Sequence, residues 1–349
     1  MSGQNKDSSM FYKRFKFYFK SSGIYPLLKR IRFFFEVQRE YGGDKRMFMK
    51  NYVDSSPSTI DKVSYEMIRT IHSVEKGFSN DNPRPFGILP TNTLMKLVKE
   101  YERLSAEQSG EKNFSYQMTI GCLTSYVRFY EEKGWTQESQ YQVVKSFLEE
   151  RASEASVPAG VIPYSLDKLN EGMQFDYLSF VKGRRSVRKF SGEKVPEEVM
   201  RECIDIAKYA PSACNRQMVK VYDVRSEKAS DYIVRFAQGK SAFVLDTVSF
   251  LRITFDMNSF YFSGERNQGW FNAGLFAMNL INAMHSKGIG SCFIQFGNTN
   301  SEEKKIKADL GIPGSERIAI ILAYGYYTDE TKVPDSTRKE TDSIYRIIQ

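Results

Sequence analysis

Residues 184–190 read Arg-Arg-Ser-Val-Arg-Lys-Phe, and they place several cations and one hydroxyl at the start of an ordered region. In an extended backbone, alternate residues face the same side, so Arg184, Ser186 and Arg188 would converge on one anion. Guanidinium groups meet two phosphate oxygens at once, which makes this pattern typical of a phosphate site. Taken alone, the segment is equally well interpreted as a solvated charge run beside a domain boundary.

A second polar segment follows a predicted helix. Residues 210–217 read Ala-Pro-Ser-Ala-Cys-Asn-Arg-Gln, and Pro211 ends the helix. Ser212, Asn215 and Gln217 then offer a hydroxyl and two amides, which supply both donors and acceptors for the pyrimidine edge of a flavin. A polar helix-terminating loop is the alternative interpretation. We interpret Cys214 as a small packing residue.

The hydrophobic pattern divides the chain into two halves. Residues 10–153 read mostly as helix, with Gly42-Gly43 ending a helix that begins at Ile24. After about residue 178, helices and strands alternate, which predicts an α+β fold with helices packed against a mixed sheet. Asn300 and Glu303 predict a capping box. The expected domains are basic aromatic helices at 1–50, a helical domain at 51–155, a linker at 156–177 and the α+β domain at 178–349.

Four motifs in this order resemble the nitroreductase family of FMN-dependent enzymes. They are the two segments above, the helix Gly274-Leu-Phe-Ala-Met-Asn-Leu280 and the segment Lys287-Gly-Ile-Gly-Ser-Cys292. The resemblance covers about residues 178–349 and implies a nitroreductase-like fold there, preceded by an all-α N-terminal region. This chain departs from the family where Met218-Val219 replaces a frequent Pro-Trp, which puts the shape of the substrate pocket in doubt.

The resemblance also implies which residues contact FMN. It assigns contacts with the phosphate and ribityl chain to Arg184, Ser186 and Arg188, and contacts with the ring to Ser212, Asn215 and Gln217. It also places a turn at Gly290 and Ser291 beside the flavin N5–O4 edge. Arg338 is assigned a further contact with the phosphate. Arg216 is an additional ring candidate, and Gln238 and Lys240 are candidates for a middle-region ring contact.

The function implied by the resemblance is ping-pong transfer of hydride from NAD(P)H through FMN to a nitroaromatic, a quinone or another small acceptor. Because the flavin carries the chemistry, no side-chain base is required and we name no catalytic residue. The family forms homodimers with two flavins at the subunit interface, so a homodimer is expected. We interpret His285 as a helix-end charge or core residue, whereas Trp270 and Phe271 fit either a core or a cavity lining.

The composition limits which kinds of binding site and which cellular location are expected. With 349 residues, two domains are expected. The chain has four cysteines without a Cys-x-x-Cys pair and only two histidines, which argues against a zinc or iron–sulfur site and a disulfide framework and favours the cytoplasm. No stretch approaches the length of an uncharged membrane span, and the opening residues lack the apolar region of a signal peptide.

The positive charge is confined to the N-terminus. Of 50 Lys and Arg and 42 Asp and Glu, 12 and 4 lie in residues 1–50, which leaves 38 of each sign in the remainder. A neutral main body makes nucleic acid an unlikely partner. Residues 10–35 hold seven Lys or Arg, no acidic residue and many phenylalanines. We favour packing of these aromatic residues on the helical domain, and the alternative is peripheral attachment to an anionic membrane surface.

Two other functions stay open. The helical extension, with His72-Ser-Val-Glu-Lys-Gly77, is similar to that of extended nitroreductase-like proteins associated with surface polysaccharide loci. This favours a peripheral-membrane or partner-binding protein whose flavin domain is vestigial or a scaffold. A flavin-dependent dehydrogenase or dehalogenase is the third option, because one fold supports several chemistries.

Overall fold

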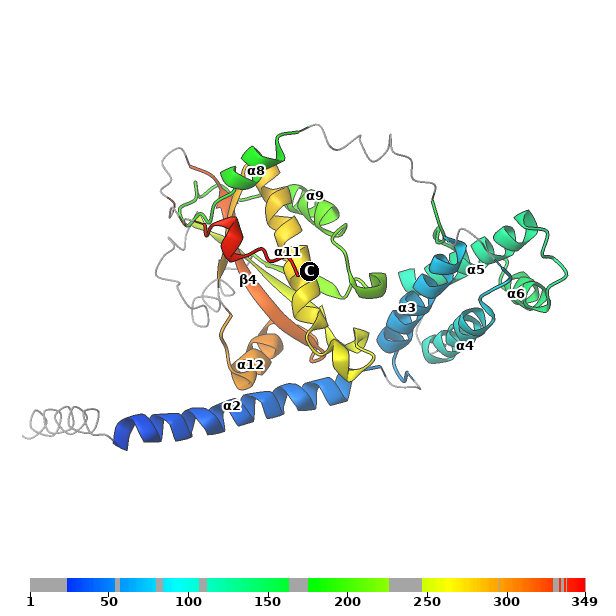
Figure 1. Ribbon diagram of the computed structural model, residues 1–349, viewed down its shortest axis with the longest axis horizontal. Coiled ribbons are helices and arrows are strands. Elements are labelled where there is room, and N and C mark those ends of the chain that lie inside the picture. Colours follow the sequence, from blue (N-terminus) through cyan, green and yellow to red (C-terminus); the bar gives the residue numbers. More distant parts are fainter. Residues whose placement is uncertain are drawn as a thin grey trace, which may run out of the picture.

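The structure is a computed structural model, and it contains two regions that differ in secondary structure, an all-helical part and an α+β part (Figure 1). It describes residues 24–53, 57–79, 84–106, 112–162, 175–225, 247–294, 296–328, 333, 336 and 338–348. The predicted α+β class is therefore confirmed, and so is the helical N-terminal region within the described residues. The predicted helix at residues 11–20 lies outside them. None of the described helices combines the length and the apolar character needed to cross a bilayer.

The described part of the N-terminal half consists of helices. They are α2 (Ile24–Asn51), α3 (Ile60–Phe78), α4 (Ile88–Ser105), α5 (Phe114–Glu132) and α6 (Ser139–Glu149). The last four of these form a common apolar core. Met67, Leu94 and Tyr126 come from three of these helices and are fully buried together. Side chains cap two of the helices, because Thr59 accepts from the Lys62 N–H and Asn113 accepts from the Tyr116 N–H.

Helix α2 continues through the two glycines that were expected to end it. Gly42 and Gly43 both keep helical backbone geometry, so the predicted stop is wrong. Contacts with the C-terminal half hold the helix beyond this point, since Asp44 forms an ion pair with Arg317 at 2.8 Å. A Cβ atom on Gly43 would lie 2.6 Å from Asn300 Nδ2, so this glycine allows a close approach between helices.

The C-terminal half is built on a four-stranded sheet. The strands are β1 (Val219–Val224), β2 (Ser249–Asp256), β3 (Ile289–Ile294) and β4 (Glu316–Tyr326). They lie in the order β1-β2-β4-β3, and each neighbouring pair is antiparallel. Along the free edge of β3, Ser186 forms a parallel bridge with Ser291. The four described strands therefore form an antiparallel sheet, and the parallel contact is this single bridge outside them.

The helices of this half are α8 (Tyr177–Gly183), α9 (Glu197–Ala207), α11 (Gln268–Ser286) and α12 (Asn300–Leu310). Of these, α9 and α11 enclose the main core against the sheet. Cys203 of α9 and Leu280 of α11 are fully buried against β2 residues such as Leu251. The capping box of α12 uses Thr299 and Glu302, one residue before the predicted pair, because Thr299 rather than Asn300 adopts the extended conformation of a cap.

The helical half packs directly against the α+β half. The Phe48 ring of α2 stacks on Phe260 with centroids 5.8 Å apart. The Tyr65 hydroxyl of α3 lies 3.4 Å from the Asp256 carboxylate, and the Arg69 guanidinium lies 4.3 Å from the centre of the Tyr261 ring. Helix α3 also contacts the short 3-10 turn Ala213–Asn215, which belongs to the predicted ring-binding loop. The extension therefore reaches the candidate site.

Candidate functional site

The predicted phosphate segment is extended and runs along β3. Arg184 caps the C-terminus of α8, and the Val187 N–H then donates to the Ser291 carbonyl at 3.0 Å. Val187 and Phe190 are buried in a small core on one face of the sheet. Ser186 stays exposed, and Arg184 and Arg188 are half-buried. Ser186 and Arg188 thus flank the buried Val187, whereas Phe190 is buried too and does not follow strict alternation, and the segment lies beside Gly290 and Ser291.

Arg184 has a buried donor that no described protein atom accepts. Its Nε atom is buried without a hydrogen-bond partner among the described residues. Such an orphan donor is costly unless another group binds it, and a phosphate oxygen would satisfy it. Together with Ser186 and Arg188, this donor set therefore fits the phosphate of FMN.

His285 and Tyr327 complete the wall beside Arg184. The His285 Nδ1 atom lies 2.9 Å from the Tyr327 hydroxyl. Burial and the positive charge of Arg184 lower the pKa of His285. Burial raises the pKa of Tyr327, and Arg184 opposes that rise. Both side chains are therefore neutral at pH 7, and the positive potential of this end of the site comes from the arginines.

Gly290 and Ser291 lie inside β3 and not in the turn to which the family pattern assigned them. The turn falls at Lys287 and Gly288, where Gly288 has the positive φ of 72° that a turn requires. The β3 pattern continues through Gly290 because this residue pairs with Gly325 of β4. A Cβ atom on Gly290 would lie 3.0 Å from the Tyr327 ring, so the glycine permits close packing there. Ser291 is buried, and its carbonyl already accepts from Val187.

Cys292 follows directly and is also buried. Burial raises the pKa of its thiol, although Arg188, the Ser186 hydroxyl and Arg184 each act in the opposite direction. The thiol is therefore protonated at neutral pH and is a poor nucleophile. The site contains no evident covalent catalyst in the described residues.

The predicted ring-binding loop has an unusual backbone. Cys214, Asn215 and Gln217 all have φ values near +50°, in the left-handed region that glycine prefers. Asn tolerates this conformation, whereas Cys and Gln adopt it at a cost. The loop is held by the Ser212 hydroxyl, which accepts from the Gln217 N–H at 2.8 Å. Strain of this kind concentrates at functional sites, and it directs the Asn215 and Gln217 side chains toward solvent, where both are exposed.

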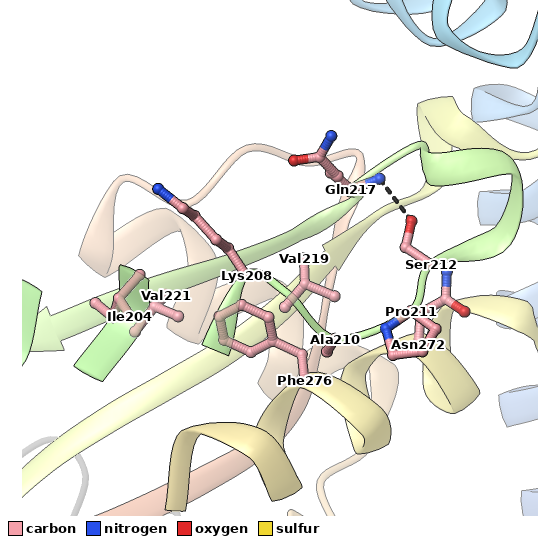
Figure 2. A pocket seen from close by; sticks show the side chains of 10 residues that line it. All are labelled: Ile204, Lys208, Ala210, Pro211, Ser212, Gln217, Val219, Val221, Asn272 and Phe276. Atoms are coloured by element: carbon pink, nitrogen blue, oxygen red, sulfur yellow. Dashed lines mark hydrogen bonds between the residues drawn. The ribbon is translucent and has the colours of Figure 1, made fainter. Parts of the chain in front are cut away.

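This loop borders a pocket of about 250 Å³ (Figure 2). Figure 2 shows Ser212 and Gln217 at one end, Phe276 of α11 and Val219 of β1 in the middle, and Ile204 and Val221 at the other end. The lining is mostly apolar, as in many small-molecule sites. Met218 does not contribute, because it is fully buried and its sulfur accepts from Ser259. Of the two residues that replace the family's Pro-Trp pair, Met218 therefore lies in the core and Val219 lies in the pocket wall.

Arg216 is a structural residue, contrary to the expectation that it could contact the ring. Its side chain is 1% exposed and forms a bidentate ion pair with Glu265, with distances of 2.9 and 2.7 Å. The guanidinium also donates to the carbonyls of Ala213 and Ser259. Burial would raise the pKa of Glu265, but hydrogen bonds from Arg216 and the Tyr261 N–H outweigh it and lower the pKa. The pair ties the loop to the segment after β2.

The two predicted halves of the site lie toward opposite ends of α11. The loop pocket includes Asn272, in the second turn of α11, whereas Arg184 lies beside His285, at its last turn. Thirteen residues of helix correspond to about 20 Å. Arg338 is exposed and donates to the Ser336 carbonyl, and Gln238 and Lys240 lie outside the described residues. Within one chain, the structure joins Arg184, Ser186 and Arg188 to Gly290 and Ser291 and keeps the loop apart.

Sequence reasoning missed three residues near the site. His285 was assigned to a helix end without its link to Arg184, and neither Tyr327 nor Glu265 was singled out. A histidine or tyrosine without a distinctive neighbour gives no spacing signal, so long-range contacts of this kind need the fold. Trp270 is partly exposed and packs edge-on against Phe255, with centroids 4.9 Å apart, so it is neither fully buried nor part of the pocket in Figure 2.

Comparison with known proteins shows which protein family the α+β part of the chain resembles. The model of the nitroreductase family matches residues 181–326. Human iodotyrosine deiodinase 1 is 25% identical over 197 residues, which are 48% of this chain and 67% of that protein. The mouse protein of the same name is 24% identical over 197 residues, which are 48% of this chain and 68% of that protein.

Solved structures are similar over the same half. A nitroreductase family protein from Streptococcus pneumoniae TIGR4 is 26% identical, with a TM-score of 0.43, and the match covers 50% of this chain and 100% of that one. An FMN-dependent nitroreductase from Clostridium difficile R20291 is 20% identical, with a TM-score of 0.40, and the match covers 48% of this chain and 98% of that one.

The fold and the cationic edge of β3 define an α+β protein with a candidate anion site. The nitroreductase family model matches residues 181–326 of its C-terminal part, which supports an enzyme of the oxidoreductase type. The resemblance seen in the sequence motifs is therefore confirmed for this part of the chain. The helical half lies outside the matched residues.

Proposed function

We propose that this protein is an FMN-dependent oxidoreductase of the nitroreductase type. The observation that carries the proposal is the buried Nε atom of Arg184, which has no hydrogen-bond partner among the described residues and lies in a segment that also presents Ser186 and Arg188 along β3. The family match at residues 181–326 supports the same cofactor. The orphan donor distinguishes an anion site from a solvated charge run, whose donors would all reach water.

The chain's residues would hold FMN by its two ends. Arg184, Ser186 and Arg188 would bind the phosphate, and Asn215 and Gln217 would bond the pyrimidine edge of the ring. When bound, FMN supplies the centre that accepts and passes on hydride. The protein's part is to orient that group, exclude water and place donors near its edge. We propose NAD(P)H as the donor and a small nitroaromatic or quinone as the acceptor, alternating at one opening with ping-pong kinetics.

We further propose that two copies of the chain complete each site. Within the described residues, the phosphate segment lies along β3, whereas the pocket of the ring-binding loop lies toward the other end of α11. A second copy would supply the missing loop to each phosphate segment. The homodimer that the family resemblance implies is consistent with this arrangement.

Reductive dehalogenation is the second candidate, because two relatives in the comparison are iodotyrosine deiodinases. We keep it as a rival choice of acceptor for the same flavin site. A panel of one nitroaromatic, one quinone and one halogenated tyrosine separates the two. Faster turnover of the halogenated tyrosine would favour dehalogenation, and faster turnover of the others would favour the nitroreductase activity. We also propose a cytoplasmic location, which the free thiols of all four cysteines support.

The decisive experiment changes the phosphate segment. Arg184→Ala with Arg188→Ala should release FMN from the purified protein, weakening its binding by about a hundredfold or more, because two charge-assisted hydrogen-bond donors are lost. Absorbance in the flavin bands and the melting temperature are measured together. The matched control is Arg201→Ala with Lys305→Ala, which removes two exposed cations from other helices.

The control should keep its flavin. A colourless wild-type protein that refuses added FMN at saturating concentration contradicts the proposed cofactor. Full retention of FMN by the arginine variant contradicts only the phosphate assignment.

A further inference from the structure

The N-terminal turns of α2 carry an apolar stripe that packs against nothing in the described part of the chain. Leu27, Leu28, Ile31, Phe34 and Phe35 recur at the i, i+1, i+4, i+7, i+8 spacing that places them on one face of a helix. Their exposed fractions run from 43% to 65%. The expectation that these aromatic residues pack on the helical domain is therefore wrong for residues 27–35. The residues before Ile24 lie outside the described range.

The stripe points away from the rest of the molecule. Farther along the same helix, Glu40, Asp44 and Met47 face the α+β half. The backbone N–H of Asn300 donates to the Glu40 carboxylate at 2.7 Å, and Met47 packs against the main core. At about 100° per residue, this contact face lies roughly opposite the stripe. In Figure 1 the N-terminal turns of α2 extend past α12. A flat surface could therefore meet the stripe without touching the sheet.

The flanks of the stripe are positively charged. Lys29, Arg30 and Arg32 are all exposed, and residues 24–35 contain no Asp or Glu. At about 100° per residue, Arg30 and Arg32 fall on the two sides of the stripe. This is the pattern of a helix that lies in a membrane interface, with its apolar face among the acyl chains and its cations at the headgroups.

We propose that α2 docks this protein on an anionic membrane surface through Leu27, Leu28, Ile31, Phe34 and Phe35. The helix lies in the plane of the interface, and Arg30 and Arg32 bind the headgroups on either side. The opposite face of α2 keeps the oxidoreductase half beside the membrane. The attachment is independent of FMN and of the acceptor.

A second copy of the chain is a less suitable occupant. Two stripes packed together would bring Lys29, Arg30 and Arg32 of both copies close to each other. No carboxylate within residues 24–35 could pair with them. An anionic bilayer supplies the opposite charge over its whole surface, so the charge pattern favours lipid.

The test compares two phenylalanines with nearly the same exposure. Phe35 lies in the stripe and is 65% exposed, whereas Phe33 is 64% exposed and lies on the opposite side of the helix. The full-length chain, Phe35→Glu and Phe33→Glu are each sedimented with two kinds of vesicle. One is pure phosphatidylcholine, and the other contains about one third phosphatidylglycerol. Sedimentation velocity and thermal melting without lipid are measured for the same proteins.

The wild-type protein should bind the anionic vesicles at least about tenfold more tightly than the neutral ones. Phe35→Glu should weaken this binding about tenfold, and Phe33→Glu by less than about threefold, because only Phe35 enters the bilayer. Equal losses in both variants, or equal binding to both vesicles, would overturn the proposal. A change of oligomeric state confined to Phe35→Glu would also overturn it, because the stripe would then be a contact between copies.

Discussion

Arg184 influences the titration of His285, and this effect can be measured because the chain contains only two histidines. Burial and the Arg184 charge both lower the pKa of His285, so its neutral form is favoured in the fold. We predict that Arg184→Met raises this pKa, though not to its usual value, because burial remains. An NMR titration of the two imidazole Hε1 signals measures the shift.

The same pKa has a consequence for stability. A histidine whose pKa is lower in the fold than in the unfolded chain disfavours folding once it protonates. The free energy of unfolding should therefore fall as the pH drops below about 6.5, the pKa of a histidine in the unfolded chain. The share of this fall that comes from His285 should be smaller in Arg184→Met. A pKa of His285 that is unchanged in this variant would contradict the contact between the two residues.

The Arg216–Glu265 pair should matter for folding more than for chemistry. Glu265→Gln would leave the Arg216 charge buried without a compensating carboxylate, and breaking such a pair costs about 3 kcal/mol. Urea unfolding at pH 7 measures this loss. Because the pKa of Glu265 is lowered, its contribution is present above the unfolded pKa and disappears as the pH falls through the folded value. The variant's deficit should therefore diminish in acid.

The matched control for this prediction is an ion pair on the surface. Glu197 and Arg201 are 2.6 Å apart on α9, with side chains 59% and 72% exposed. Glu197→Gln should cost less than about 0.5 kcal/mol, because solvent screens exposed pairs. A similar small cost for Glu265→Gln would show that the buried pair does not hold the loop.

At the scale of single residues, the sequence predicted an extended segment at 184–188 but not the residues that contact it. The segment is extended and forms a bridge with β3, and its binding of phosphate stays a prediction. The role of Arg216 was not, because only the fold brings Glu265 to it from 49 residues away. Gly290 was misplaced for a related reason. A glycine two residues after another glycine resembles part of a turn, whereas here pairing with Gly325 continues the strand.

Helix α2 shows how tertiary contacts override a local stop signal, and its two glycines should respond differently to substitution. Gly42→Ala should stabilise the protein by about 0.5–1 kcal/mol, because alanine restricts the unfolded chain and favours helix. The new Cβ would meet only the end of the Arg46 side chain, at 3.7 Å. Gly43→Ala should lose that gain, because its Cβ would lie 2.6 Å from Asn300 Nδ2. Thermal melting of the two variants measures the difference.

Asn300 cannot easily move aside for that Cβ atom. Its Nδ2 donates to the Glu40 carbonyl at 2.8 Å, and its backbone N–H donates to the Glu40 carboxylate. Equal stabilisation by both substitutions would mean that α2 and α12 are not in close contact. The strands β1 (Val219–Val224) and β2 (Ser249–Asp256) both lie in the part of the chain where the sequence pattern alternates helices and strands.

For the molecule as a whole, the helical extension and the oxidoreductase half share one surface. Tyr65 and Arg69 of α3 lie against the segment that follows β2, and α3 touches the ring-binding loop. The sequence predicted that the helices exist but not where they dock, because interfaces between halves leave no periodic signal. Any acceptor that reaches the loop would therefore approach beside α3.

The proposed two-chain site makes a prediction that a one-chain site does not. One variant, Arg184→Ala with Arg188→Ala, lacks the two arginines proposed to bind the phosphate. The other, Asn215→Gly with Gln217→Gly, lacks the loop amides, and glycine keeps the left-handed backbone of both positions. Each variant alone should lose FMN. In a mixed dimer purified through two different tags, one site would carry both defects and the other would carry none. The mixed dimer should thus bind one FMN per dimer with wild-type affinity. If each chain built its own site, every site would hold one defect and no tight binding would return.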